Sequence, residues 1–329
     1  MVVFGLLMTS IAMVYWQILL AQGFCVGIGT GCLFTPSVAL LSTYFSSKLM
    51  IAMGLCASGS GIGKESATVA DRERAYACEI GGTVLLIIFH RLQPDIRFPW
   101  ATRTVAFSSL GTLAIPNAVM KVRMLPRQRC KLFDLSAWKD PAYCLYVLGA
   151  FVAFVGIFTP HFYIGLYAFE MAATSPETAF YLAVITGGSI IGRIGPNLLA
   201  AKIGTYNVLV QCMILTGVFA FGFIDAQSLT STIMVGVLYG FFSGAIVSIS
   251  PTLAVQLSPS RAVIGNRMGM VFSAAGAAML IGPPVAGKLL DNHGFNAAFD
   301  FPGVCAIVGA VILWASRGFH RGWRVMKKL

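Results

Sequence analysis

Long apolar stretches separated by short polar clusters run the whole length of the chain. Residues 1–47 contain no Asp, Glu, Lys, Arg or His. At about 1.5 Å per helical residue they suffice for two membrane spans, which we expect to divide near Tyr15–Trp16 because aromatic residues favour the interface. A third apolar run starts at Met50 and is interrupted. Further spans are predicted at about 101–120, 141–168, 178–201, 205–224, 229–256, 264–287 and 295–315.

Composition supports a membrane protein of the all-α class, a polytopic helical bundle. Hydrophobic residues make up 57% of the chain and charged residues 11%, whereas a soluble domain has about 25% charged residues. The eight cysteines are dispersed and show no metal-ligand spacing, so no metal or other cofactor is predicted. Because no catalytic motif is present, an enzyme is not expected. The net charge of +11 does not indicate nucleic acid, since the charges lie in short clusters between apolar runs.

Residues 64–81 form an anomalous charged insertion within the third apolar run. Seven of the chain's 35 charged residues lie in 64–79, where a span should continue. Removing 64–81 would join two apolar segments into one continuous apolar run and keep the reading frame. Our hypothesis is an unspliced short intron or a misplaced exon boundary, and the alternative is a real loop that breaks the helix.

Basic residues are unevenly distributed between the predicted loops. Six lie in 121–139 and five in 317–329, and the remaining loop residues on the same side include Lys48, Lys202 and two arginines, Arg261 and Arg267. The positive-inside rule places this side in the cytoplasm if the interrupted run counts as one span. We expect an integral multi-pass protein, with the plasma membrane as its location and the lipid bilayer as its surroundings.

A weak internal repeat suggests two related halves. The second predicted span resembles the eighth, and the start of the third resembles the start of the ninth, so the offset is six spans in both cases. Parallel six-helix repeats build major facilitator transporters. The predicted organisation is a partial N-terminal helix bundle at 1–120, a basic cytoplasmic linker at 121–140, a C-terminal six-helix bundle at 141–316 and a basic cytoplasmic tail at 317–329.

Particular motifs carry a family resemblance. YFSSKLMIAMG at 44–54, followed by ASGSGIG at 57–63, is similar to the fifth-helix signature of the monocarboxylate transporter family in its fungal branch. AFYLAVITGGSIIGRIGPNLLA at 179–200 and VLYGFFSGAIVSISPT at 237–252 match as well. The resemblance implies an incomplete major facilitator fold of about ten of twelve helices, N-terminally truncated, with Met1 inside the third. The acidic partner that animal members place four residues before the eighth-helix arginine is Ser189 here.

Arg193 is the principal candidate for chemistry. It is the one charged residue in the 24-residue apolar stretch 178–201. An arginine at mid-membrane is costly, so it normally faces a bundle interior or an aqueous cavity. Its planar fork can hold a carboxylate by two parallel hydrogen bonds. The alternative is a side chain that snorkels to the interface. Asn197, one turn away, is the candidate partner of Arg193.

Three further side chains are candidate substrate contacts. His161 lies mid-span and could relay protons near neutral pH, or it could be a packing histidine beside Pro160. Tyr163, in the same aromatic-rich stretch, and Tyr239, in the eighth predicted span, could line a cavity, although helix packing would also explain them.

The predicted function is secondary transport of a monocarboxylate or a related small organic anion by alternating access, with protons as the expected coupling ion. Two alternatives remain open. One is a major facilitator carrier of another small molecule, and the other is a truncated membrane protein that does not transport.

Overall fold

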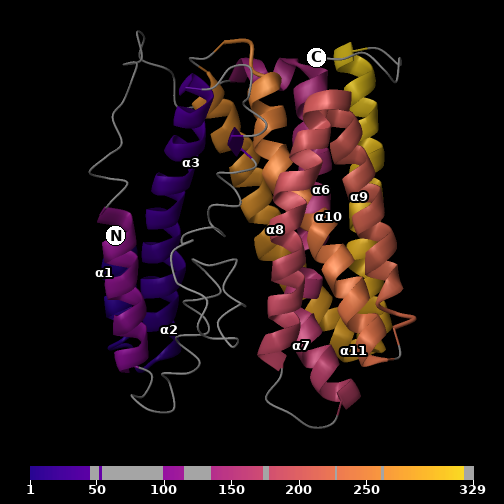
Figure 1. Ribbon diagram of the computed structural model, residues 1–329. Helices are drawn as coiled ribbons and strands as arrows, with labels where there is room; N and C mark the ends of the chain where they lie inside the picture. Colours follow the sequence, from indigo (N-terminus) through magenta and orange to yellow (C-terminus); the bar gives the residue numbers. More distant parts are fainter. Residues whose placement is uncertain are drawn as a thin grey trace, which may run out of the picture. The chain divides into compact units, whose positions relative to one another are not determined.

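The computed structural model describes residues 1–44, 52–53, 99–114, 135–172, 178–226, 228–260 and 263–321. The described chain is helical almost throughout, as the apolar pattern predicts (Figure 1). It divides into two compact units, Met1–Tyr44 with Ser60–Arg127, and Phe45–Gly59 with Gln128–Leu329. The charged insertion at 64–81 and the basic segment 121–134 lie outside the described residues.

The first unit contains the N-terminal helices and the helical residues 99–114. Its helices are α1 (Val2–Thr9), α2 (Tyr15–Ile18), the π-helix η1 (Leu19–Val26) and α3 (Gly27–Tyr44). The run from Tyr15 to Tyr44 is continuous, and it matches the second predicted span. Gly5 of α1 approaches η1 so closely that an added Cβ would lie 2.7 Å from the carbonyl oxygen of Ala21.

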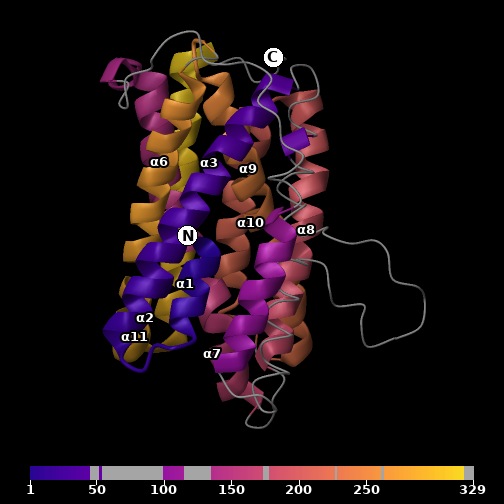
Figure 2. The same cartoon turned by 90° about the vertical axis from the view of Figure 1, so that its left-hand side faces the viewer.

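The described part of the second unit holds six longer helices. They are α6 (Pro141–Ile157), α7 (Thr159–Ala172), α8 (Thr178–Ile203), α9 (Thr205–Gly222), α10 (Leu229–Gln256) and α11 (Ile264–Arg321). A short 3-10 helix, η2 (Leu135–Lys139), precedes α6. The main packing partners are α6 with α11, α8 with α10, and α9 with both α10 and α11. Figures 1 and 2 show α8 and α10 side by side along most of their lengths.

Local signals account for several helix ends. Ser228 and Ser231 form a capping box that starts α10, in which the Ser228 side chain accepts from the Ser231 N–H at 3.2 Å. Within α11, Gly294 has φ 78° and ψ −175°, a conformation that side-chain-bearing residues rarely adopt, and it separates the two predicted spans 264–287 and 295–315.

The predicted span 141–168 is not one regular helix. It breaks at Phe158, between α6 and α7, just before Thr159 and Pro160. A proline has no N–H for the helical hydrogen-bond ladder and its ring crowds the preceding turn, which explains a break at this point.

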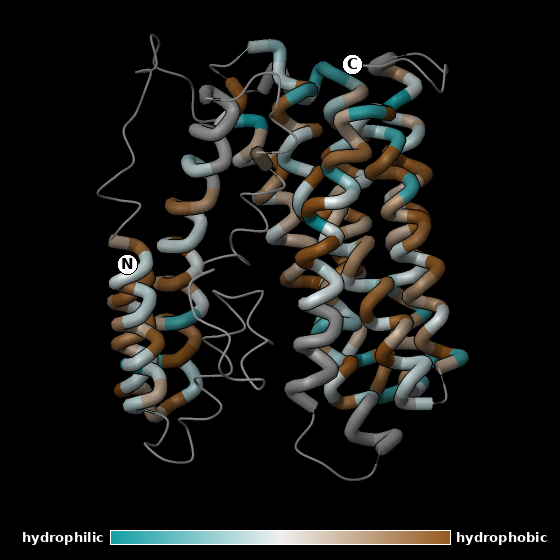
Figure 3. Tube along the Cα trace, viewed as in Figure 1, coloured by the Kyte–Doolittle hydropathy of each residue, from teal (hydrophilic) through white to brown (hydrophobic). Residues whose placement is uncertain are grey.

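Among the described residues, five helical stretches are long and apolar enough to cross a membrane: Tyr15–Phe34, Pro141–Tyr167, Thr205–Gly222, Thr230–Gln256 and Ile264–Phe319. Large apolar side chains such as Leu280, Phe162 and Ile191 are exposed, and apolar segments recur along helices α6 to α11 (Figure 3). Such outward-facing apolar groups suit a lipid surrounding.

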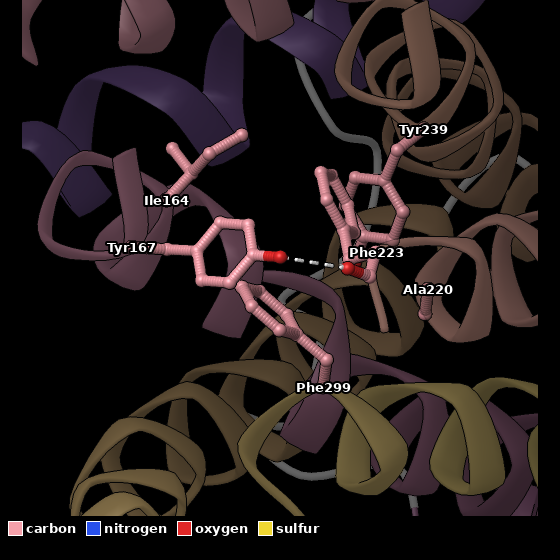
Figure 4. Packing of buried hydrophobic residues seen from close by; sticks show 6 residues of the cluster. All are labelled: Ile164, Tyr167, Ala220, Phe223, Tyr239 and Phe299. Carbon is pink, nitrogen blue, oxygen red and sulfur yellow. Dashed lines mark hydrogen bonds between the residues drawn. The ribbon is translucent and has the colours of Figure 1, made fainter. Parts of the chain in front are cut away.

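An aromatic core holds part of the second unit together. It consists of Ile164, Tyr167, Ala220, Phe223, Tyr239 and Phe299 (Figure 4). The hydroxyl of Tyr167 donates to the carbonyl oxygen of Phe223 at 3.2 Å and to that of Ala226 at 3.0 Å, which satisfies two carbonyls at the end of α9. The Tyr239 ring belongs both to this core and to the candidate site.

Candidate functional site

Glycines place the backbone of α8 directly against α10. A Cβ on Gly188 would overlap the carbonyl oxygen of Val237, and one on Gly192 would overlap that of Phe241. Small residues four apart allow this close approach of two helices in a membrane. Since Arg193 follows Gly192, the contact with α10 fixes the position of the Arg193 backbone, from which its side chain extends.

Arg193 is half-buried, and its Nε atom is shielded from solvent. The side chain lies near His161 of α7. A partly exposed guanidinium between apolar helices is a suitable partner for an entering anion, because water competes less there than at a surface.

Asn197 joins α8 to α10. Its Nδ2 donates to the backbone carbonyl of Arg193 at 2.6 Å and to the Ser248 hydroxyl oxygen at 2.7 Å. The side chain is 1% exposed. The predicted partner of Arg193 therefore contacts its main chain, and it holds this turn of α8 against α10.

His161 lies within a group of aromatic rings. Its ring centroid is 5.6 Å from that of Phe158 and 5.8 Å from that of Tyr239. Tyr239 is fully buried, and its hydroxyl donates to the carbonyl oxygen of Ile157, the last residue of α6, at 2.8 Å. Tyr239 thus reaches from α10 to the break between α6 and α7.

Two polar atoms at this break make no hydrogen bond to the described part of the chain: the Thr159 hydroxyl oxygen and the Nδ1 of His161, both buried. Buried polar atoms normally have a partner, so such a pair indicates a place for water or for a ligand. The sequence analysis did not single out Thr159. A threonine before a mid-span proline is the signal that could have found it.

Tyr163 has a different surrounding from the other candidates. Its hydroxyl donates to the carbonyl oxygen of Pro283 at 2.9 Å, and it lies against Gly287 of α11. The structure therefore brings Arg193, His161 and Tyr239 into one neighbourhood, whereas it places Tyr163 at the contact between α7 and α11. Among the residues described, no group of three His, Cys, Asp or Glu could hold a metal ion.

Comparison with known proteins identifies the family of this chain. Residues 146–325 match the Major Facilitator Superfamily. The MFS-type transporter dbaD of Emericella nidulans is 36% identical over 316 residues, covering 95% of this chain and 67% of that protein. The aspyridones efflux protein of the same organism is 34% identical over 328 residues, covering 97% and 63%. A crystal structure of a human organic anion transporter has a TM-score of 0.71 at 16% identity, covering 95% of this chain and 74% of that one.

The chain spans about two thirds of the length of these curated relatives. The likeness to the human transporter concerns the fold, which is the all-helical fold of membrane carriers. The match along α6 to α11 and the similarity to fungal transporters lead to one conclusion: this chain belongs to the major facilitator superfamily, a family of non-enzymatic membrane transporters.

Proposed function

We propose that this protein exports an organic anion with an aromatic or otherwise apolar body, by alternating access. The observation that carries the proposal is the half-buried Arg193 of α8 near His161, whose ring lies beside those of Phe158 and Tyr239. The guanidinium supplies two parallel donors for a carboxylate, and the rings supply a surface on which an apolar body can pack.

The substrate class proposed here is broader than a short-chain monocarboxylate. The resemblance of the sequence motifs favours a small monocarboxylate. The name of one relative, the aspyridones efflux protein, favours export of a larger organic compound. A carboxylate or similar acidic group is the feature that Arg193 would recognise in either case.

Proton linkage is the coupling that we propose, with His161 as the group that gains and loses the proton. The Nδ1 of His161 is buried at the break between α6 and α7, and an imidazole can take up and release a proton. The proposed location is the plasma membrane.

Transport of a matched pair of probes tests the proposal. Purified chain in proteoliposomes is given radiolabelled salicylate or its neutral amide, salicylamide, under an imposed proton gradient. We expect transport of salicylate above that of empty liposomes, with salicylamide at the background level, because only the carboxylate can pair with Arg193. Equal transport of both probes would favour the alternative predicted from the sequence, a major facilitator carrier of another small molecule.

Substitutions at two cationic residues of α8 test whether salicylate transport depends on Arg193. Arg193→Gln should lower salicylate transport by about tenfold or more, since hydrogen bonds to charged groups contribute about 1.5–3 kcal/mol. Arg193→Lys should fall between the two, because lysine keeps the charge and loses the bidentate fork. Lys202→Gln, at the exposed end of the same helix, should transport like the parent. Unchanged transport by Arg193→Gln would remove Arg193 from the site.

A further inference from the structure

A second arginine is buried at the end of the second unit where α6 begins, α10 ends and α11 begins. Arg267 is 4% exposed and lies in the first turn of α11. A cation at a helix N-terminus faces the positive end of the helix dipole, and a buried charge is costly unless it is compensated. Its neighbours must therefore offset both effects.

The end of α10 supplies one compensation. The Nη1 of Arg267 donates to the carbonyl oxygen of Leu257, the residue that caps α10, at 2.6 Å. The last carbonyls of a helix have no partner within it and carry partial negative charge, so a guanidinium there satisfies an acceptor and complements the dipole of α10.

Residues at the start of α6 supply the remaining compensation for the charge of Arg267. The Oδ2 of Asp140 lies 3.8 Å from the Nη1 of Arg267, and the Oδ1 of the same carboxylate caps α6 by accepting from the Ala142 N–H at 3.1 Å. The Tyr143 ring lies 4.9 Å from the guanidinium carbon, in cation–π contact. The Tyr143 hydroxyl donates to the backbone carbonyl of Arg267 at 2.8 Å. One arginine thus contacts the ends of three helices.

The first turn of α6 is also held from its other side. The Ser316 hydroxyl, near the end of α11, donates to the Ala142 carbonyl at 2.6 Å, and its oxygen lies 3.1 Å from the hydroxyl oxygen of Tyr206 in α9. The hydrogen bonds of Ser316 are neutral, so Arg267 and Asp140 are the charged members of this set of contacts.

We propose that Arg267 is a positioning residue. Together with Asp140, Tyr143 and the Leu257 carbonyl it forms an arginine clamp that keeps the ends of α6, α10 and α11 together while the bundle moves as one body. The inference rests on the proposed transport function. A buried ionic cluster contributes little net stability compared with apolar packing, so its value lies in specifying one arrangement of the three helix ends.

Cys144 provides a local probe of the clamp. It follows Tyr143 in α6, is half-buried, and its thiol donates to the carbonyl oxygen of Trp138 at 3.2 Å. Cys212 of α9 is buried elsewhere in the same unit and reports loosening of the whole bundle. The experiment measures maleimide labelling of two full-chain variants, each retaining only one of these cysteines.

Arg267→Met should raise the labelling rate of Cys144 by about tenfold or more, since loss of a charge-assisted hydrogen bond shifts local opening by that order. The labelling rate of Cys212 should not change. Lys288→Met, which removes an exposed cation of α11, should label like the parent. An unchanged Cys144 rate, or an equal rise at Cys212, would overturn the proposal. Should Arg267→Met fail to fold, Asp140→Asn should raise Cys144 labelling to a smaller extent.

Salicylate transport gives the functional readout. Arg267→Met should lower the maximal rate and leave the half-saturating concentration within about twofold of the parent, because Arg193 stays in place. A raised half-saturating concentration with unchanged Cys144 labelling would show that Arg267 acts on the substrate, and would overturn the clamp. If the parent chain transports no salicylate, the proposed function fails, and the labelling of Cys144 still decides the clamp.

Discussion

At the scale of single residues, two arginines in apolar helices have different surroundings. Arg267 is 4% exposed and bonded to the ends of neighbouring helices, whereas Arg193 is half-buried near His161. Because the energetic cost of a charge depends on its partners, the first arrangement suits a structural contact and the second suits a ligand. Both residues are single cations in an apolar stretch, so the amino-acid pattern alone does not separate them.

The Tyr239 hydroxyl gives a prediction at this scale. Tyr239→Phe removes its hydrogen bond to the Ile157 carbonyl beside His161. We expect a loss of about 1 kcal/mol of unfolding free energy and a reduced rate of salicylate transport, since the α6–α7 break and the His161 ring lose a support. Thermal unfolding followed by fluorescence, together with transport in proteoliposomes, measures both effects.

Tyr163→Phe is the matched control. It also removes a tyrosine–carbonyl hydrogen bond, at Pro283, yet it lies at the contact between α7 and α11. We expect a similar loss of stability with transport close to that of the parent. If both variants lose transport equally, the effect of Tyr239 is one of stability alone.

The candidate site was partly predictable from the sequence. Arg193 stands out as the only charge in a 24-residue apolar run, and His161 and Tyr239 as polar groups within spans. The spacing from Arg193 to Asn197 correctly indicates neighbours on one helix face, but it cannot tell that the amide bonds to the main chain and to Ser248. Contacts between helices depend on packing that no local pattern encodes.

At the scale of elements, chain-local chemistry predicts helix ends well. The bounds of α10 coincide with the predicted 229–256 because a capping box starts the helix. The break between α6 and α7 was not predicted, since prolines are tolerated in many membrane helices and Pro160 gives no certain signal. In the count of basic residues Arg267 was treated as a loop residue, whereas the structure places it buried in α11. The sequence does not reveal this burial, because the partners of Arg267 come from distant parts of the chain.

The close contact between α8 and α10 gives a prediction at this scale. Gly192→Ala places a methyl group against the Phe241 carbonyl, which should lower the unfolding free energy by about 1–3 kcal/mol and displace Arg193. Thermal unfolding of the purified variant should show a lower melting temperature, and salicylate transport should fall with it.

Gly195→Ala is the control on the same helix. A Cβ there would lie 3.8 Å from the Phe241 ring, in ordinary contact, and alanine favours a helix over glycine by about 1 kcal/mol. We expect unchanged or higher stability. A Gly192→Ala protein as stable and active as Gly195→Ala would contradict the close contact between α8 and α10.

At the scale of the whole molecule, composition predicts that the protein is a membrane protein, but it does not predict what the protein transports. An apolar chain with few charges must place its surface in lipid, and the family match bears out a helical transporter. The division into bundles and the charged insertion stay predictions, and residues 64–81 lie outside the described chain. The substrate cannot be predicted at this scale, since members of one fold carry different compounds.

Binding of salicylate to the purified chain tests whether Arg193 holds the anion. Isothermal titration calorimetry in detergent compares the parent, Arg193→Gln and Lys202→Gln. We expect Arg193→Gln to raise the Kd for salicylate by about tenfold or more, and Lys202→Gln to leave it unchanged. The same Kd for Arg193→Gln and the parent would contradict a site in which Arg193 holds the anion.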